Sequence, residues 1–425
     1  MAKLPQQKEQ KPGSCTYHLL GFVTGGLGLG ESSRQTLQRM QELNIALSVR
    51  NVDSRDHRAK QISGFEQILE TRRKHWPGHI NLIHVNPPEF GNLILDQYPN
   101  IPAIRNLNVI IPFWELPVLT ESWILPLEAM DCVLAPTRFI QETISKHFPD
   151  KPIIHYPQSV NIKRAPKPDR ARFELPDDAF VFLCGFDAMS CMERKNPMAS
   201  IAAFKKAFQG GEKVRLLIKV SNPDFDGARE KLEQMKAGDD RIVIYSEILP
   251  REELEQLYAS CDALISLHRS EGLGLFIMEM MAQAKPTIVT AWSGNMDFTT
   301  PENSCLVDFK MVPVQSRHPA YQFCAKAPEA CWADADTDCA AGWMRALVAD
   351  RQLCARIGKQ AHETMAQLRE NDCAGVFAQL EEMHRHGFKR SKQARSYIRK
   401  KRLKHLGKKI ERSFKRVIGR TQGRP

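Results

Sequence analysis

One stretch of the chain, residues 262–284, places three local features in an order that few folds accommodate. The segment DALISL predicts a buried strand, Gly272 and Gly274 predict a turn with unusual backbone angles, and LFIMEMMAQA has the length and propensity of a helix. Backbone N–H groups in such a loop and at the start of the helix can surround a phosphate, and the helix dipole favours its negative charge. The stretch therefore predicts an α/β fold that binds a phosphorylated ligand.

Two glutamates bracket this turn, Glu271 at the strand end and Glu279 on the helix. The residues on either side of Glu279 are all apolar: Ile277, Met278, Met280 and Met281. An unpaired charge is costly in such surroundings, so Glu279 needs a partner. A ribose offers two adjacent hydroxyls to one carboxylate, while Glu271 would face a transferred sugar at the carboxyl edge of a parallel sheet. The alternative partner of Glu279 is an arginine or lysine elsewhere in the chain.

Apolar runs alternate with helical or loop segments along the chain, which is the βαβ pattern of parallel sheets. The predicted strands are YHLLGFV, NLIHVN, NVIIPFW and CVLAP in the first half, and FVFLC, VRLLIKV, RIVIY, DALISL and TIVTA in the second. Residues 155–178 between them are rich in proline and charge and predict a linker. A chain of 425 residues with 42% hydrophobic content suits two domains, which we place at 1–165 and 166–388, followed by a tail at 389–425.

The sequence argues against several classes of protein. Charged residues and prolines interrupt the apolar runs well short of the roughly 20 residues that a membrane-spanning helix requires. The polar start of the chain lacks a cleavage pattern, so we expect no secretory signal. The 11 cysteines are scattered without a C-x-x-C pair, which favours reduced cytoplasmic thiols. A disulfide or metal site is the alternative for three of them: Cys324, Cys331 and Cys339.

Several motifs, in order, resemble one family. The pattern E-G-x-G-L with a second glutamate eight positions after the first, followed by K-P and S-G-N, resembles the family four retaining glycosyltransferases. FDAMSCMERKNPMASIAAFKKAF is similar to the R-K-N-P donor-phosphate segment of that family's bacterial cell-surface polysaccharide branch. TGGLGLGESSRQTLQRM, IIPFWELP and VLAPTRFIQETI resemble its amino-terminal domain, so the likeness spans about residues 17–370. It implies the GT-B fold, in which two Rossmann-like domains face each other across a cleft.

The resemblance also implies roles for individual residues. Glu271 would orient the donor sugar, and Arg194 and Lys195 would stabilise the leaving diphosphate without a metal ion or other cofactor. The arginine that many relatives carry after the strand glycine is absent here, because Phe186 and Asp187 follow Gly185. The donor-binding candidates are Gly26, Gly28, Gly272, Gly274, Leu275 and Glu279. Taken alone, GGLGLG is also compatible with a plain turn, while Ser33 stands where a dinucleotide fingerprint needs its third glycine.

Polar residues at or after the strand ends of the first domain are the candidates for the acceptor side. They are His84, Asn86 and Glu115, with Glu89 nearby. Relatives use a histidine or acid in this region, and the sequence does not choose among these residues. Any one of them is more often a structural hydrogen-bonding group than a catalytic one.

The tail differs from the rest of the chain in charge. Residues 389–425 contain 16 lysines and arginines against the single Glu411, so the tail carries +15 and the remaining residues −4 of the total of +11. Five apolar residues recur at spacings of three and four and predict an amphipathic helix: Leu403, Leu406, Ile410, Phe414 and Val417. Such a helix suits an anionic membrane surface. Nucleic acid is the less favoured partner because the tail has two aromatics for stacking, and a solvated end is the remaining alternative.

Together these features predict a cytoplasmic enzyme bound peripherally to the inner face of the membrane. It would transfer a hexose from a nucleotide diphosphate sugar to a growing, lipid-linked glycan in cell-surface polysaccharide synthesis. Because many relatives use GDP-mannose, mannose is the expected sugar. Two alternatives stand beside this expectation: a sugar-nucleotide epimerase on the same scaffold, and a non-catalytic scaffold tethered by its tail to a membrane or nucleic acid.

Overall fold

The first of two parallel sheets is built from strands of the amino-terminal half. The computed structural model describes residues 15–26, 28–54, 62–72, 75–76, 78–161, 166–371 and 373–421. The sheet has the strand order β2-β1-β3-β4-β5-β6. Its strands are β1 (Tyr17–Gly21), β2 (Leu47–Asn51), β3 (Ile80–His84), β4 (Leu107–Ile110), β5 (Cys132–Ala135) and β6 (Ile153–His155). The helices of this domain are α1 (Gly28–Glu42), α2 (Pro87–Glu89), α3 (Leu95–Gln97), α4 (Glu121–Glu128) and α5 (Arg138–Ser145).

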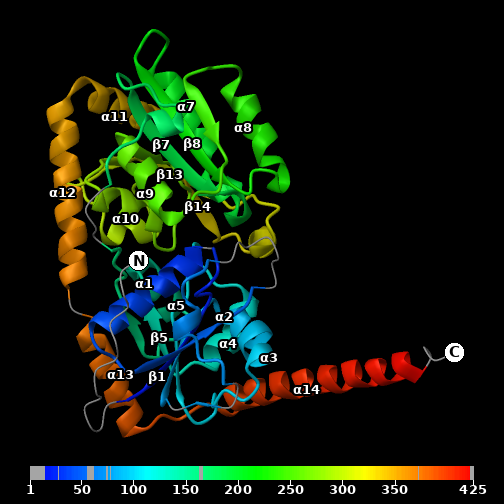
Figure 1. The fold of residues 1–425 in the computed structure, drawn as a ribbon. Helices are drawn as coiled ribbons and strands as arrows, with labels where there is room; N and C mark the ends of the chain where they lie inside the picture. The colour runs from blue at the N-terminus through cyan, green and yellow to red at the C-terminus, as the bar shows by residue number, and fades with distance from the viewer. Residues whose placement is uncertain are drawn as a thin grey trace.

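The second sheet repeats this architecture in the order β12-β11-β10-β7-β8-β9, and its strands are also parallel. They are β7 (Phe180–Asp187), β8 (Val214–Ser221), β9 (Ile242–Tyr245), β10 (Ala263–Ser266), β11 (Thr287–Thr290) and β12 (Cys305–Val307). The helices are α6 (Met192–Lys195), α7 (Pro197–Ala207), α8 (Ala228–Lys236), α9 (Arg251–Ser260), α10 (Leu275–Ala282), α11 (Thr337–Ala349) and α12 (Arg351–Glu370). The two sheets form two lobes stacked one above the other (Figure 1). The predicted pair of Rossmann-like domains is therefore confirmed.

The strand orders locate a switch point in each sheet. In the first, the chain passes from β1 to β2 on one side and then crosses over β1 to β3 on the other side. In the second, the reversal lies between β7 and β10. Ligands of open α/β sheets bind outside the carboxyl ends of the strands at such points. The glycine-rich loop after β1 and the loop after β10 both follow a strand at a switch point.

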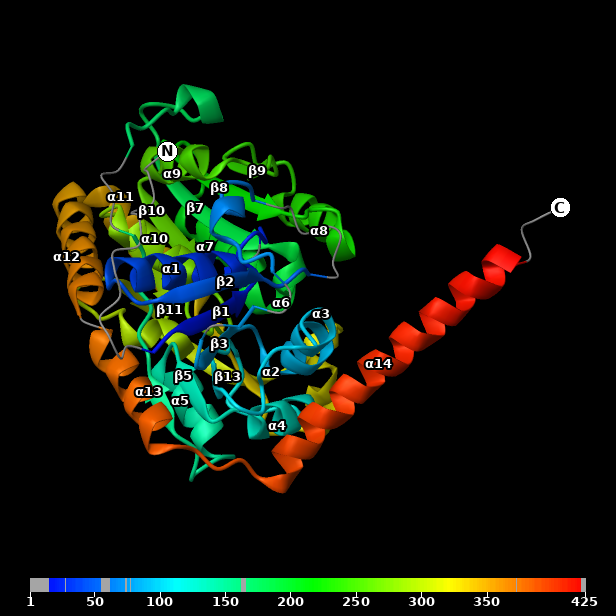
Figure 2. The same cartoon turned by 60° about the horizontal axis from the view of Figure 1, so that its bottom comes forward.

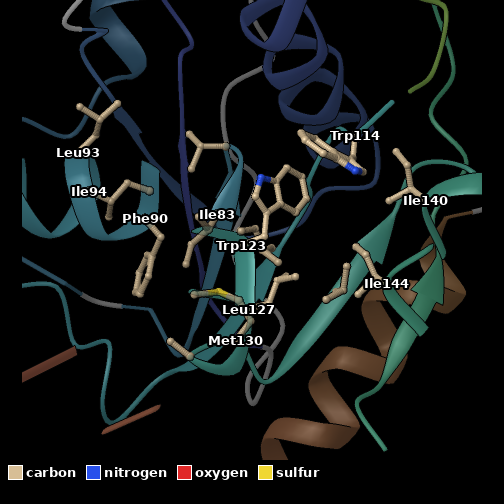
Figure 3. Close-up of a cluster of buried hydrophobic side chains, with 14 of the residues drawn as sticks. Ile83, Phe90, Leu93, Ile94, Trp114, Trp123, Leu127, Met130, Ile140 and Ile144 are labelled. Carbon is tan, nitrogen blue, oxygen red and sulfur yellow. The ribbon is translucent and has the colours of Figure 1, made fainter. Parts of the chain in front are cut away.

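A segment of the second half completes the core of the first domain. Large apolar side chains around Trp114 and Trp123 form this core (Figure 3). Strands β13 (Phe309–Pro313) and β14 (Cys331–Ala335) form an antiparallel hairpin, and residues 314–330 connect them. Tyr321, in this connection, belongs to the same cluster and lies 6.3 Å from Trp114 between ring centroids. The sequence analysis did not predict this hairpin or its packing.

The chain returns to the first domain after α12. Helix α13 (Ala374–His386) lies beside the lower lobe (Figure 1). Its Phe377 packs edge-on against Tyr17 and Tyr156, with ring centroids 5.7 and 6.0 Å apart, and the Tyr17 hydroxyl donates to the Phe377 carbonyl. The apolar face of α13 covers the core of the first domain, so this helix packs on the first domain although it lies within the range 166–388 predicted for the second.

The predicted tail is largely one helix, α14 (Lys392–Thr421), which projects away from the body (Figure 2). Its start is docked: Ala394 and Ile398 are fully buried, and the helix contacts α3 and α4. Farther along, Leu403 and Leu406 are exposed. The side chains of Ile410, Phe414 and Val417, the remaining apolar positions of the predicted face, lie outside those that the structure describes.

Two observations bear on the sequence-based expectations about membrane-spanning helices and cysteines. Among the described helices, none is both long and apolar enough to cross a membrane. All 11 cysteines lie within the described ranges, and each is a free thiol. The disulfide weighed for Cys324, Cys331 and Cys339 is therefore not formed in this structure.

Candidate active site at the domain interface

The loop after β10 packs closely against the first domain. Gly274 precedes α10 with a φ of +92°, a conformation that glycine adopts without strain. A Cβ atom on Gly272 would lie 3.0 Å from the carbonyl oxygen of Trp114, so the close approach favours glycine. The Thr137 hydroxyl donates to the Gly272 carbonyl at 3.0 Å. The backbone angle of Gly274 and the close packing of Gly272 thus explain why glycine occupies both positions, and the loop contacts both domains.

Glu271 lies in a buried cluster of opposite charges. Its Oε1 is 2.5 Å from Lys195 Nζ, and its Oε2 is 3.4 Å from Arg194 Nη1. Burial alone would raise the pKa of Glu271, but Lys195 and Arg194 together lower it to about 2. The carboxylate is therefore ionised at neutral pH. The structure brings together the three residues predicted to be catalytic.

The two cations differ in how they are held. Arg194 Nη1 donates to the Ser270 carbonyl at 2.8 Å and Nη2 to the Ser190 carbonyl at 3.0 Å, and the side chain is 5% exposed. Arg194 therefore holds the segments around Ser190 and Ser270 together. The Lys195 side chain is 22% exposed, so Lys195 is the better candidate to meet a diphosphate.

Glu279 is buried as predicted, and its partner in this structure is an arginine. Arg251 Nη1, at the start of α9, lies 2.5 Å from Glu279 Oε1. The same guanidinium contacts Glu255 at 2.8 Å and faces Glu31 of α1 at 3.9 Å. Burial raises the pKa of Glu279, Arg251 opposes this shift, and Glu31 adds to it. The salt bridge considered as the alternative is thus present in the structure without ligand.

In the glycine-rich loop of the first domain, close contacts require glycine at Gly30, which is not among the donor-binding candidates predicted from sequence. Gly26 is exposed, and Gly28 begins α1, where an added Cβ would meet open space. An added Cβ on Gly30 would lie 2.1 Å from the Gly25 carbonyl oxygen. Sterically, the loop therefore depends on Gly30. Leu275, the remaining donor candidate, is the first residue of α10 and packs on the apolar cluster below it.

Two of the acceptor-side candidates make mainly internal contacts. His84 is fully buried, and its Nε2 lies 3.3 Å from Ser32 Oγ and 3.2 Å from Gln158 Nε2. Burial lowers the pKa of His84 to about 3, so the ring is neutral at physiological pH. Asn86 Oδ1 accepts the Phe113 N–H at 2.8 Å. These contacts hold the strand ends together.

Glu115, the third acceptor-side candidate, links the domains. Its Oε2 accepts the Tyr321 hydroxyl at 3.2 Å, and its Oε1 lies 3.7 Å from Arg194 Nη2. A chain of polar contacts therefore runs from Tyr321 through Glu115 and Arg194 to Glu271. Glu115 is the predicted acceptor-side residue closest in contact to the donor cations.

The sequence analysis missed three residues of this site. Arg251 lies at the start of α9 and Tyr321 in the connection between β13 and β14, and no local pattern marks either residue. His268 is fully buried, and neither ring nitrogen has a hydrogen-bond partner among the described residues. Its place three residues before Glu271, at the end of a predicted strand, was a signal that could have been used.

Comparison with protein families identifies part of the chain. The family model described as glycosyl transferases group 1 matches residues 180–313, from the start of β7 to the end of β13. Residues 180–313 of the second domain are therefore similar to group 1 glycosyltransferases, and the predicted class of enzyme, a glycosyltransferase, is confirmed. No curated protein matches the sequence.

Solved structures share the fold at low sequence identity. Sucrose-phosphate synthase from Thermosynechococcus elongatus has a TM-score of 0.59 at 16% identity over 88% of this chain and 98% of its own. The UDP-forming trehalose-phosphate synthase from Burkholderia xenovorans has a TM-score of 0.58 at 12% identity, over 88% and 99%. Anabaena HepE, solved with UDP and glucose, has a TM-score of 0.56 at 14% identity, over 87% and 99%. These likenesses establish the two-domain GT-B architecture.

Proposed function

We propose that the protein transfers a hexose from a nucleotide diphosphate sugar to a growing glycan, retaining the configuration of the donor sugar. The observation that carries this proposal is the Lys195–Glu271 pair beside the loop–helix junction after β10, at the interface with the first domain. We propose UDP as the donor nucleotide, because the names of several fold relatives include UDP. This choice replaces the guanosine nucleotide expected from sequence, and mannose stays the predicted sugar.

The arrangement suggests a division of roles. Lys195, the more exposed cation, would stabilise negative charge on the leaving diphosphate as the sugar–phosphate bond breaks. The backbone N–H groups at the start of α10, together with the positive end of the helix dipole, would stabilise the same diphosphate. Glu271, ionised and held by Lys195, would orient the sugar hydroxyls. Glu279 would bind the ribose hydroxyls, which requires that it share or exchange its contact with Arg251.

Thermal stabilisation by nucleotides tests the donor site. UDP, GDP, ADP and NAD are each added to the purified protein, and we expect UDP to raise the melting temperature, since a site saturated at 100 times its Kd adds about 2.7 kcal/mol. In Glu279→Ala, UDP affinity should fall at least about tenfold, equivalent to about 1.4 kcal/mol, because the ribose loses its carboxylate. Calorimetric titration measures this loss.

Glu255→Ala is the matched control for that variant. Glu255 also contacts Arg251, at 2.8 Å, but it belongs to α9 and lies outside the predicted donor loop. It should bind UDP within about twofold of the wild type. Unchanged affinity in Glu279→Ala would remove the ribose assignment, and stabilisation by GDP alone would replace uridine by guanosine in the proposal.

We also propose that α14 attaches the enzyme to the anionic cytoplasmic face of a membrane, where a lipid-linked acceptor would be presented. Leu403 and Leu406 are 65% and 52% exposed, next to a dense run of lysines and arginines. Each cation near an anionic surface contributes about 1 kcal/mol. Because the start of α14 is docked on the first domain, the membrane would lie on the acceptor side of the enzyme.

Truncation after residue 402 tests this attachment. Residues 403–425 contain Leu403, Leu406 and eight lysines and arginines, and their removal keeps the buried Ala394 and Ile398 at the docked start of α14. We expect the full chain to sediment with vesicles rich in phosphatidylglycerol and the truncated chain to remain in solution. Vesicles of phosphatidylcholine alone are the control and should bind neither protein. Undiminished sedimentation of the truncated chain would contradict the proposal, and UDP binding should be the same in both.

A further inference from the structure

One arginine stands among three carboxylates where the predicted ribose site meets the facing domain. Arg251 comes from α9 and lies 28 residues before Glu279 in the sequence. Its guanidinium is 2.5 Å from Glu279 on α10, 2.8 Å from Glu255 on its own helix and 3.9 Å from Glu31 on α1. The first two contacts lie within the second domain, and the third crosses the domain interface.

Arg251 is the cation that favours the ionised form of Glu279 against burial and the charge of Glu31. Glu279 is 8% exposed, and Glu31 faces it from the other domain. On α9, the Tyr258 hydroxyl also faces Glu279, and on α1 Arg34 pairs with Glu31 at 2.8 Å. Arg251 is thus the cation in direct contact with Glu279. A neutral carboxyl is a weaker acceptor for a hydroxyl than a carboxylate is.

We propose that Arg251 is a positioning residue for the donor nucleotide. By pairing with Glu279 it keeps this carboxylate ionised and directed for the ribose hydroxyls, and its approach to Glu31 connects the occupied donor site to the first domain. The inference rests on the proposed function, because it takes Glu279 to be the ribose-binding group. Nucleotide affinity would then depend on the start of α9 as well as on the donor loop.

A second arginine shows what an ordinary ion pair in this domain looks like. Arg172 contacts Glu247 and Glu253, each at 3.2 Å, and its side chain is 42% exposed, as is that of Arg251. Glu253 and Glu247 are themselves well exposed, whereas Glu279 is buried. Exposed pairs of this kind contribute little to stability. Arg172→Gln is therefore a matched control that removes an arginine with two exposed glutamate partners, neither of which is Glu279 or Glu31.

The test uses calorimetric titration of UDP and of 2′-deoxy-UDP into the full-length protein between about pH 6.5 and pH 8.5, a range that brackets neutrality. In Arg251→Gln, burial and Glu31 would shift the pKa of Glu279 further upwards, opposed only by the Tyr258 hydroxyl, so a larger share of the carboxyl would be protonated at the lower pH. We expect UDP affinity to fall about tenfold or more at the low end of this range and to recover as pH rises. The preference for UDP over 2′-deoxy-UDP should shrink at low pH in the same variant.

Three further variants separate charge from structure. Arg251→Lys keeps the cation and should restore a pH-independent preference for UDP over its deoxy analogue. Adding Glu31→Gln to Arg251→Gln removes the opposing carboxylate and should recover part of the affinity. Arg172→Gln should match the wild type. Both recoveries depend on charge, so a purely structural role for Arg251 would produce neither.

The outcomes distinguish this inference from the proposal on which it rests. Wild-type affinity in Arg251→Gln across the range, or a loss that is equal at every pH and for both nucleotides, would overturn the role of Arg251 while leaving the donor site in place. Failure of the wild-type protein to bind UDP would overturn the proposed donor, and this inference with it.

Discussion

Lys195→Ala is expected to slow cleavage of the donor by about 10²–10³-fold while leaving the fold intact, because preorganised charge next to a leaving group is worth about this much in related settings. Lys195 is the partly exposed cation of the pair, and Arg194 is engaged by the Ser270 and Ser190 carbonyls. Arg194 therefore cannot replace it without giving up those contacts. The release of UDP from UDP-sugars, measured without an acceptor, follows this step.

Two variants make the Lys195 result specific. Lys206→Ala removes another lysine, near the opposite end of the following helix, where it pairs with the exposed Asp338 at 2.8 Å. Its rate should match that of the wild type. Lys195→Arg keeps the positive charge and should retain more activity than Lys195→Ala. If Lys195→Ala releases UDP at a rate within a few-fold of the wild type, leaving-group stabilisation must come from elsewhere.

Most strands that could be predicted from sequence are buried on both faces, and β9, with three partly exposed residues out of four, is an exception. The runs around Leu82, Val109 and Leu264 are continuous and apolar, because helices cover both sides of a parallel sheet. Strand β6 has only three residues, all partly exposed, and the hairpin strand β13 carries a lysine and exposed positions, so both lack this pattern. The return of α13 to the first domain depends on long-range packing of Phe377, which no local periodicity encodes.

The candidate site also has a part that could be predicted from sequence and a part that could not. Glu271, Glu279 and the two loop glycines lie in one continuous stretch, so their spacing in the sequence predicts that they share a site. Arg251 reaches that stretch from another helix, and Tyr321 reaches Glu115 from a connection between two hairpin strands. The contact of Arg251 with Glu279 exists only once the second domain has folded, and that of Tyr321 with Glu115 only once the two domains have assembled. Sequence spacing could indicate that Glu279 needed a partner, but it could not identify Arg251.

The docking of α14 leads to the second large effect, which is on stability. Arg390 precedes the helix and is almost entirely buried, and its guanidinium donates to Asp131 and to the carbonyls of Ala103, Ile104 and Asn106. The side chains of the Arg390–Asp131 pair are each 4% exposed. Arg390→Ala would leave a buried carboxylate without its cation, so we expect a loss of about 3–5 kcal/mol in the free energy of unfolding of the first domain. Chemical denaturation measures this loss.

Arg399→Ala is the control for Arg390→Ala, because Arg399 is exposed on the same helix and its removal should change the unfolding free energy by about 0.5 kcal/mol or less. Adding Asp131→Asn to Arg390→Ala should recover part of the loss, since the neutral amide is cheaper to bury than an unpaired carboxylate. This recovery separates charge compensation from the simple loss of contacts. Near-native stability of Arg390→Ala would mean that the start of α14 is not held by this pair, and that the apolar contacts of Ala394 and Ile398 suffice to fix the arm that carries the proposed membrane site.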